Sequence, residues 1–228
     1  MGGSAAGGPI APRVAVDSAA AAADVVCRPD LDANTTDTID DTAITRWREY
    51  ALLSALLGRP PDEALLKRLA RLESDGTPLG LAHKALAEAA AEKDVAAIAR
   101  EYFDLFIGVG RGELLPYGSY YLTGFLHERP LARLRGDLAD LGIERVEGQC
   151  EPEDHAAILC EVMAGLIAGE FAVPVGRQRY FFDRHLASWM AQFYGDLEAA
   201  KAADFYRPVG AIGRLFIEIE TQAFALSR

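Results

Sequence analysis

The segment EPEDHAAILCEVMAGLIAGE, residues 151–170, decides the fold class of this chain. Its apolar residues recur at helical spacing, and Pro152 suits the first position of a helix, where a missing amide hydrogen is not needed. The acids around Pro152 stand where the helix dipole favours negative charge. We therefore predict one well-defined helix over these residues.

The same helical period continues on both sides of this segment. No alternation of apolar and polar residues is long enough to indicate a strand. The pattern predicts an all-α fold: a single helical domain of about eight helices, with two sub-lobes as an alternative arrangement. The other predicted helices cover residues 42–57, 62–72, 79–92, 94–107, 130–141, 178–202 and 204–226.

Residues 1–41 differ from the rest of the chain, because they are rich in Ala, Gly, Asp and Thr and have few large apolar side chains to bury. Seven aspartates against two arginines place about five of the eleven excess negative charges here. We predict a disordered acidic tail, residues 1–41, before an all-helical domain, residues 42–228.

Composition limits the classes of function. The chain has 228 residues, half of them apolar, and a formal net charge of −11. An acidic surface repels phosphate backbones and argues against nucleic-acid binding, while it favours a basic peptide as partner and equally serves solubility. No apolar run is long enough to span a bilayer, and the N-terminus lacks the pattern of a signal peptide.

The cysteines indicate a reducing compartment. There are three, an odd number, and none forms a CxxC pair, so neither a disulfide framework nor a zinc site is indicated. Reduced thiols are typical of cytoplasmic proteins, and we expect a cytoplasmic location.

Two segments interrupt the helical pattern and concentrate aromatic, acidic and imidazole groups. One is the acidic start EPEDH, residues 151–155; the other is LPYGSYYL, residues 115–122, inside a Gly-rich connection over residues 108–129. A connection this long in a compact helical protein is usually functional or a hinge. Its aromatics are costly to leave in water, so they either hold the loop or line a groove for a partner; both interpretations stay open.

Catalysis is weakly indicated. Asp154 and His155 could act as an orienting acid and a general base, but neighbours on a helix point about 100° apart and no candidate nucleophile completes a site. The residues alone favour the interpretation of the acidic segment as an ordinary helix start. Four scattered histidines form no metal motif, so no catalytic residue, metal or cofactor is predicted. A small helical hydrolase using Asp154 and His155 remains an alternative.

Four motifs in this order resemble the TorD/DmsD family of redox-enzyme maturation chaperones, over roughly residues 47–226. The first is Tyr102-x-x-Leu-Phe-x-Gly108, followed by the LPYGSYYL segment. The third is Glu151-Pro-x-Asp-His155 with Glu-x-Met over residues 161–163, and the last is FFDRHLASW, residues 181–189, with Phe-Tyr at 205–206. Residues 1–41 have no counterpart in the family pattern.

The resemblance implies a function and a site. Members are cytoplasmic, all-helical chaperones without enzymatic activity that bind the twin-arginine signal peptide and the apo form of a molybdenum-cofactor oxidoreductase, similar to DMSO/TMAO reductase or formate dehydrogenase. They hold the client until its cofactor is inserted and so delay export. Carried over from the family, the signal-peptide-binding residues are Tyr102, Leu105, Phe106, Pro116, Tyr117, Ser119, Tyr121, Glu151, Pro152, Asp154 and His155.

The physical chemistry of such a peptide agrees with this site. An apolar groove would take the hydrophobic part of the leader as a helix, and carboxylates at the rim would take its arginines. A generic helical adaptor that binds folded partners is the third hypothesis. The long connections at 108–129 and 143–150 make a domain-swapped dimer conceivable beside a monomer.

Overall fold

The structure is a computed structural model that describes residues 41–143, 151–171, 173–174 and 176–226. Within these residues it contains ten α-helices and no β-strand, which confirms the predicted all-α class. The predicted tail lies outside the described residues except for Asp41, which already begins the first described helix. The helices are α2 (Asp41–Gly58), α3 (Glu63–Leu69), α4 (Pro78–Glu92), α5 (Val95–Tyr102), α6 (Gly118–Thr123), α7 (Arg129–Asp140), α8 (Ala156–Ala168), α9 (Arg177–His185), α10 (Met190–Ala199) and α11 (Tyr206–Leu226).

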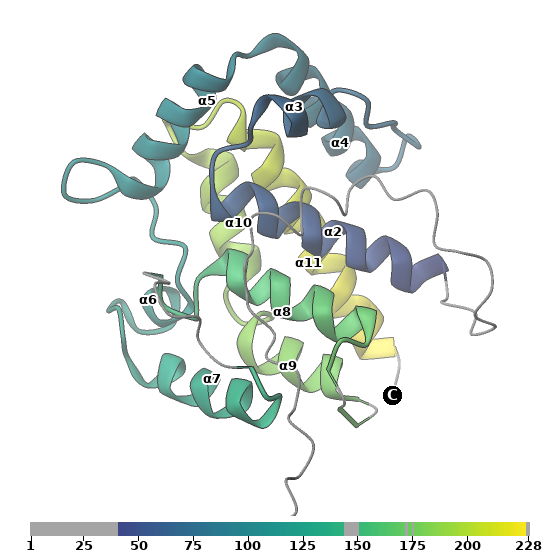
Figure 1. Ribbon diagram of the computed structural model, residues 1–228, viewed down its shortest axis with the longest axis vertical. Helices are drawn as coiled ribbons and strands as arrows, with labels where there is room; N and C mark the ends of the chain where they lie inside the picture. Colours follow the sequence, from purple (N-terminus) through teal and green to yellow (C-terminus); the bar gives the residue numbers. More distant parts are fainter. Residues whose placement is uncertain (1–40, 144–150, 172, 175, 227–228) are drawn as a thin grey trace, which may run out of the picture.

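Two pairs of helices form the centre of the molecule. Helix α2 packs along α8, and α10 packs along α11. Helices α3, α4 and α5 lie at one end of this centre, and α6, α7 and α9 lie at the other (Figure 1). Because α11 contacts α4 while α8 contacts α9, the central helices connect both ends.

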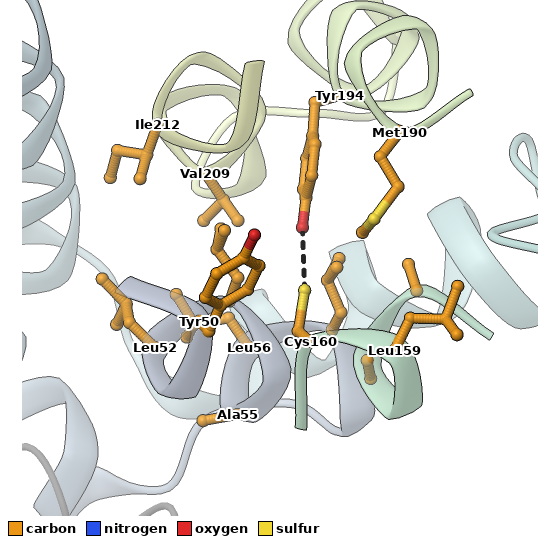
Figure 2. Packing of buried hydrophobic residues seen from close by; sticks show 14 of the residues in the cluster. Tyr50, Leu52, Ala55, Leu56, Leu159, Cys160, Met190, Tyr194, Val209 and Ile212 are labelled. Atoms are coloured by element: carbon orange, nitrogen blue, oxygen red, sulfur yellow. Dashed lines mark hydrogen bonds between the residues drawn. The ribbon is translucent and has the colours of Figure 1, made fainter. Parts of the chain in front are cut away.

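The core lies between the two central pairs. Figure 2 shows side chains from α2, α8, α10 and α11 pointing into one shared space. Tyr194 of α10 and Cys160 of α8 meet there, with 3.5 Å between the hydroxyl oxygen and Sγ. Burial raises the pKa of the Cys160 thiol to about 12, so this thiol stays protonated and unreactive.

Helices α10 and α11 approach closely because two residues of α11 are glycines. A Cβ at Gly213 would lie 2.2 Å from Cδ1 of Tyr194, and one at Gly210 would lie 2.4 Å from the backbone nitrogen of Glu198. Neither distance is possible for a real side chain, so the spacing of this helix pair depends on both glycines.

Several helix starts follow from local side-chain caps. The carboxylate of Asp94 accepts the amide of Ala97 at 2.8 Å and so caps α5. Asp62 does the same for α3, and Thr77 does so for α4. These caps satisfy amides that have no partner inside the helix.

The predicted boundaries are wrong at three places. Helix α8 begins at Ala156 rather than at residue 151, because the backbone just before it pairs with residues 116–118 instead of with the helix. The predicted helix over 178–202 is two helices, since the chain turns between Leu186 and Trp189. The connection over 108–129 contains the short helix α6. These differences account for ten helices where about eight were expected.

Candidate functional site

The two segments that interrupt the helical pattern lie against each other. Tyr117 and His155 form an isolated antiparallel bridge. The amide of Gly118 donates to the carbonyl of Asp154 at 2.9 Å, and the amide of Ala156 donates to the carbonyl of Pro116 at 2.8 Å. We call this pairing of residues 116–118 with residues 154–156 the motif bridge. It places the starts of α6 and α8 side by side.

Asp154 is buried at the motif bridge and points inward. Its Oδ2 accepts the amide of Ser119 at 2.6 Å, near the N-terminus of α6, where negative charge is favourable. Its Oδ1 and the Ser119 hydroxyl are also buried, and neither has a hydrogen-bond partner within the described residues. Asp154 therefore holds α6 in place and is not part of an acidic rim.

His155 is buried as well, and it caps α8. Its Nδ1 accepts the amide of Ala157 at 3.1 Å, so the proton of the neutral ring is on Nε2. Burial lowers the pKa of His155 to about 4, although the charges of Glu151 and Asp154 oppose this shift. The imidazole is neutral at pH 7 and contacts the backbone of its own helix.

We expect the pKa of His155 to make stability fall in acid. The unfolded chain takes up this proton near pH 6.5, whereas the folded chain does so only near pH 4. The contribution is fully present above pH 6.5 and is lost as the pH falls towards 4, by about 3 kcal/mol in total. Urea unfolding of the wild type and of His155→Gln at pH 7.5, 6 and 5 measures it.

The variant is needed because other histidines titrate in the same range. Burial also lowers the pKa of His185, which acts in the same direction, while the Glu49 carboxylate helps to hold the pKa of His83 above its ordinary value. The difference in pH dependence between wild type and His155→Gln isolates one group. Parallel curves for the two proteins would show that His155 is not held neutral.

Glu151 and Tyr117 form the outer part of this site. The Tyr117 hydroxyl donates a hydrogen bond to the carboxylate of Glu151, which is exposed. Partial burial and this contact raise the pKa of Tyr117, so the phenol stays protonated. The Tyr117 ring stands edge-on to His155 with 5.1 Å between centroids. Glu151 is thus the accessible carboxylate that the sequence assigned to this motif, and Pro152 beside it is half-buried.

The predicted contact residues at the end of α5 are mostly interior. Leu105 is fully buried, and Tyr102 is buried with its hydroxyl donating to the carbonyl of Leu57 at 3.0 Å. Burial raises the pKa of Tyr102 to about 12. Phe106 is half-buried and stands edge-on to Tyr102. These three side chains support the site from beneath.

The exposed residues of this region come from a π-helix that the sequence did not predict. Helix α5 continues as a π-helix over Phe103–Ile107, a rare element that is frequent at functional sites. Its wider turn leaves the side chains of Phe103 and Ile107 40% and 54% exposed. A sequence pattern read with a period of 3.6 cannot show this, because the π-turn changes the spacing.

Six large apolar side chains are exposed within residues 103–126. They belong to two groups, the π-helix with the loop after it and the end of α6 with the turn after it, and both lie towards the left of Figure 1. Scattered exposed apolar residues are normal, but a concentration in one region is typical of a binding surface. We call these six the exposed apolar set: Phe103, Ile107, Val109, Leu122, Phe125 and Leu126.

The loop at 108–112 is closed tightly by its glycines. Gly108 has a φ of +61°, and a Cβ there would lie 2.1 Å from the carbonyl oxygen of Arg111. A Cβ at Gly112 would lie 2.5 Å from the backbone of Phe106. The loop therefore turns back on itself and presents Val109, 98% exposed, at its tip.

Tyr121 completes the described site on the side of α10. It packs against Trp189 and Phe193, with ring centroids 5.5 and 5.8 Å away, and its hydroxyl donates to Oδ2 of Asp196 at 3.0 Å. Pro116 and Ser119, by contrast, are buried. Tyr120, one of the loop aromatics of the LPYGSYYL segment, accepts a hydrogen bond at its hydroxyl from Nη2 of Arg111 at 2.8 Å.

The contacts at Asp154 and His155 do not form a hydrolase site. Each of the two side chains accepts a backbone amide, and both are enclosed by protein. No group of three acidic, His or Cys side chains within the described residues could hold a metal ion. In that same part of the chain, no helix has the length and apolar character needed to cross a bilayer.

The comparison with protein families decides the relationship. The model described as "Nitrate reductase delta subunit" matches residues 72–195, which is 124 of the 228 residues. The chain belongs to this family. The match includes the π-helix, the motif bridge and most of α10, so it covers the predicted site residues and the exposed apolar set.

Individual relatives are distant. The chain is 27% identical over 130 residues to "Chaperone protein TorD" of Vibrio cholerae, covering 53% of this chain and 59% of that protein. It is 24% identical over 201 residues to the protein of the same name from Shewanella loihica, covering 78% and 92%. The chain thus spans less than two thirds of the Vibrio relatives it matches. These similarities confirm the resemblance to the TorD/DmsD family, and the relatives' names agree with a binding protein rather than an enzyme.

One solved structure is similar in fold. It is described as a redox enzyme maturation protein from Archaeoglobus fulgidus, with a TM-score of 0.54 and 21% identity, covering 84% of this chain and 99% of that one. At this identity the likeness establishes the arrangement of helices alone.

Proposed function

We propose that this protein is a cytoplasmic chaperone for a molybdoenzyme, which binds the twin-arginine leader and the apo form of its client until the cofactor is inserted. Membership of the family supports the class, and the chaperone relatives support the activity. The client is an exported oxidoreductase similar to DMSO/TMAO reductase or formate dehydrogenase.

The exposed apolar set is the observation that carries this proposal. A leader has an apolar segment that can fold as a helix against an apolar surface, and it has a basic end that carboxylates can bind. Ile107 and Phe125 offer apolar surface at 54% and 70% exposure. Glu151 and Asp104 offer exposed carboxylates in the same region.

The predicted site residues divide into two roles under this proposal. The members that are at least partly accessible would contact the peptide: Phe106, Tyr117, Tyr121, Glu151 and Pro152. The buried members would set the geometry of the surface, because they join α5, α6 and α8. The buried members are Tyr102, Leu105, Pro116, Ser119, Asp154 and His155.

Ile107→Ser is expected to weaken binding of a synthetic twin-arginine leader about tenfold. The reason is the loss of an exposed apolar contact of roughly 1.4 kcal/mol, within the range for burying an aliphatic side chain. Isothermal calorimetry with the leader peptide measures the dissociation constant, and thermal unfolding checks that the variant is folded.

Leu81→Ser is the matched control. Leu81 lies on α4, outside the exposed apolar set, and is 56% exposed, against 54% for Ile107. Its replacement should leave the affinity unchanged. Equal affinities for wild type, Ile107→Ser and Leu81→Ser would remove the proposed surface from the site.

A further inference from the structure

A cavity of about 400 Å³ opens beside the motif bridge, between residues 111–115, α6 and α10. Its walls include the carboxylates of Glu113 and Asp196, the phenol rings of Tyr120 and Tyr121, and the amide of Gln192. We call it the α6–α10 pocket. A concave site that combines aromatic faces with fixed carboxylates suits a cation with a flat, partly apolar surface.

The two carboxylates of the pocket are held in place by different partners. Glu113 accepts the amides of Lys201 and Ala202 at 2.8 and 3.0 Å, and these bonds lower its pKa, so it is ionised at neutral pH. Asp196 accepts the Tyr121 hydroxyl through Oδ2 only. Its Oδ1 has no hydrogen-bond partner within the described residues and remains available to a ligand.

The protein places a guanidinium of its own in this pocket. The Arg111 guanidinium lies over the Tyr120 ring, 5.3 Å from the centroid, and its Nη2 donates to the Tyr120 hydroxyl at 2.8 Å. Within the described residues Arg111 forms no ion pair with a carboxylate. The pocket thus already holds a guanidinium, the kind of group that its chemistry favours. This guanidinium does not form the ion pair that the Asp196 carboxylate could supply.

We propose that the α6–α10 pocket binds an arginine side chain of the partner peptide, and that Arg111 fills the position over Tyr120 in the free protein. The incoming guanidinium stacks on Tyr120 and donates to Oδ1 of Asp196, while the exposed Arg111 side chain turns away from Tyr120 into solvent. That the peptide is a client leader rests on the proposed function; the preference for arginine rests on the pocket alone.

Arginine fits this site better than lysine does. Its planar guanidinium can stack on an aromatic face while its edge donates to a carboxylate, whereas an ammonium is a compact, strongly hydrated charge. Arg111 lies in the exposed loop at 108–112, and within the described residues its guanidinium contacts Tyr120 rather than a carboxylate. Its departure from the pocket therefore breaks no ion pair. Competition by Arg111 lowers the apparent affinity for any external arginine.

The blocked dipeptide N-acetyl-Arg-Arg-amide tests the pocket without reference to a client. NMR titration follows the backbone amides of Gly124, Gln192 and Asp196 in uniformly labelled protein. Arg111→Gln should bind the dipeptide roughly 3- to 10-fold more tightly than the wild type does, and Asp196→Asn should bind it about tenfold more weakly. The asparagine keeps an acceptor for the Tyr121 hydroxyl, so the fold is preserved.

Two controls test whether the binding is specific to the pocket and to arginine. Arg133→Gln removes an exposed arginine of α7 outside the pocket and should behave as the wild type does, and N-acetyl-Gln-Gln-amide should shift none of these amides. Pocket amides that ignore the arginine dipeptide in Arg111→Gln, or respond equally to the glutamine one, would overturn the inference. Pocket binding of the dipeptide in a protein that ignores twin-arginine leaders would instead retain the pocket and reject the proposed client.

Discussion

Replacing Gly213 with alanine is expected to lower the free energy of unfolding by at least about 2 kcal/mol. The new methyl group would lie 2.2 Å from Cδ1 of Tyr194 and 2.3 Å from its Cε1. Tyr194 is fully buried between α10 and α8, where its hydroxyl meets Cys160, so its ring has no free space to enter (Figure 2). Helices α10 and α11 must therefore separate. Overpacking of this kind typically costs about 1 to 3 kcal/mol or more.

Gly195→Ala supplies the matched control for this prediction. Gly195 is also inside a helix, α10, but the nearest atom to its added Cβ is Cδ of Arg214 at 3.8 Å. Helix propensity alone then applies, and the variant should be neutral or up to about 1 kcal/mol more stable. Urea unfolding of both variants gives the comparison. Similar stabilities for Gly213→Ala and Gly195→Ala would show that the two helices are not in close contact at Gly213.

Arg46→Ala is expected to destabilise the protein by about 3 to 5 kcal/mol, because it leaves a buried carboxylate without its cation. Nε and Nη2 of Arg46 bind Oε1 and Oε2 of Glu220 at 2.7 and 2.8 Å, and Glu220 is only 1% exposed. The Tyr50 hydroxyl donates to the same carboxylate at 3.0 Å. This bidentate pair joins the first described helix, α2, to the last, α11.

Lys67→Ala shows what an exposed ion pair contributes. Lys67 and Glu63 are 2.7 Å apart on α3, with side chains 69% and 74% exposed, so the loss should be at most about 0.5 kcal/mol. The double variant Arg46→Leu/Glu220→Leu should recover much of the stability lost in Arg46→Ala, since it removes the unpaired buried charge. Chemical denaturation measures all three. A loss in Arg46→Ala no larger than that in Lys67→Ala would mean that Glu220 is accessible to water in the folded protein.

The candidate site was predictable as a set of segments but not as a set of side chains. Tyr117 and Glu151, which come from the two different segments that interrupt the helical pattern, are in contact. Asp154 and His155 were expected at an accessible rim and are buried instead, because each accepts a backbone amide at the start of a helix. A short polar side chain next to a helix start can cap the helix or face solvent, and the sequence pattern is the same in both cases.

The exposed apolar set also shows that the sequence does not predict which side chains face solvent. Tyr102 and Leu105 belong to the family motif and are buried. Phe103 and Ile107 come from the same stretch of sequence and are exposed. Hydrophobicity identifies all four as candidates for the core. The π-turn, in which the amide of Gly108 donates to the carbonyl of Phe103 at 2.7 Å, determines which of them face solvent.

The all-α class, most of the helices and the family were predictable without a structure, because helical periodicity, caps and short motifs are local properties that neighbours in the chain encode. The tertiary structure alone decided that residues 116–118 pair with residues 154–156, that α8 starts at Ala156, and that Arg111 reaches Tyr120. The first two depend on hydrogen bonds between segments distant in the chain, and the third joins the loop at 108–112 to α6. Which carbonyl a free amide finds is set by how the helices pack, and no local pattern records it.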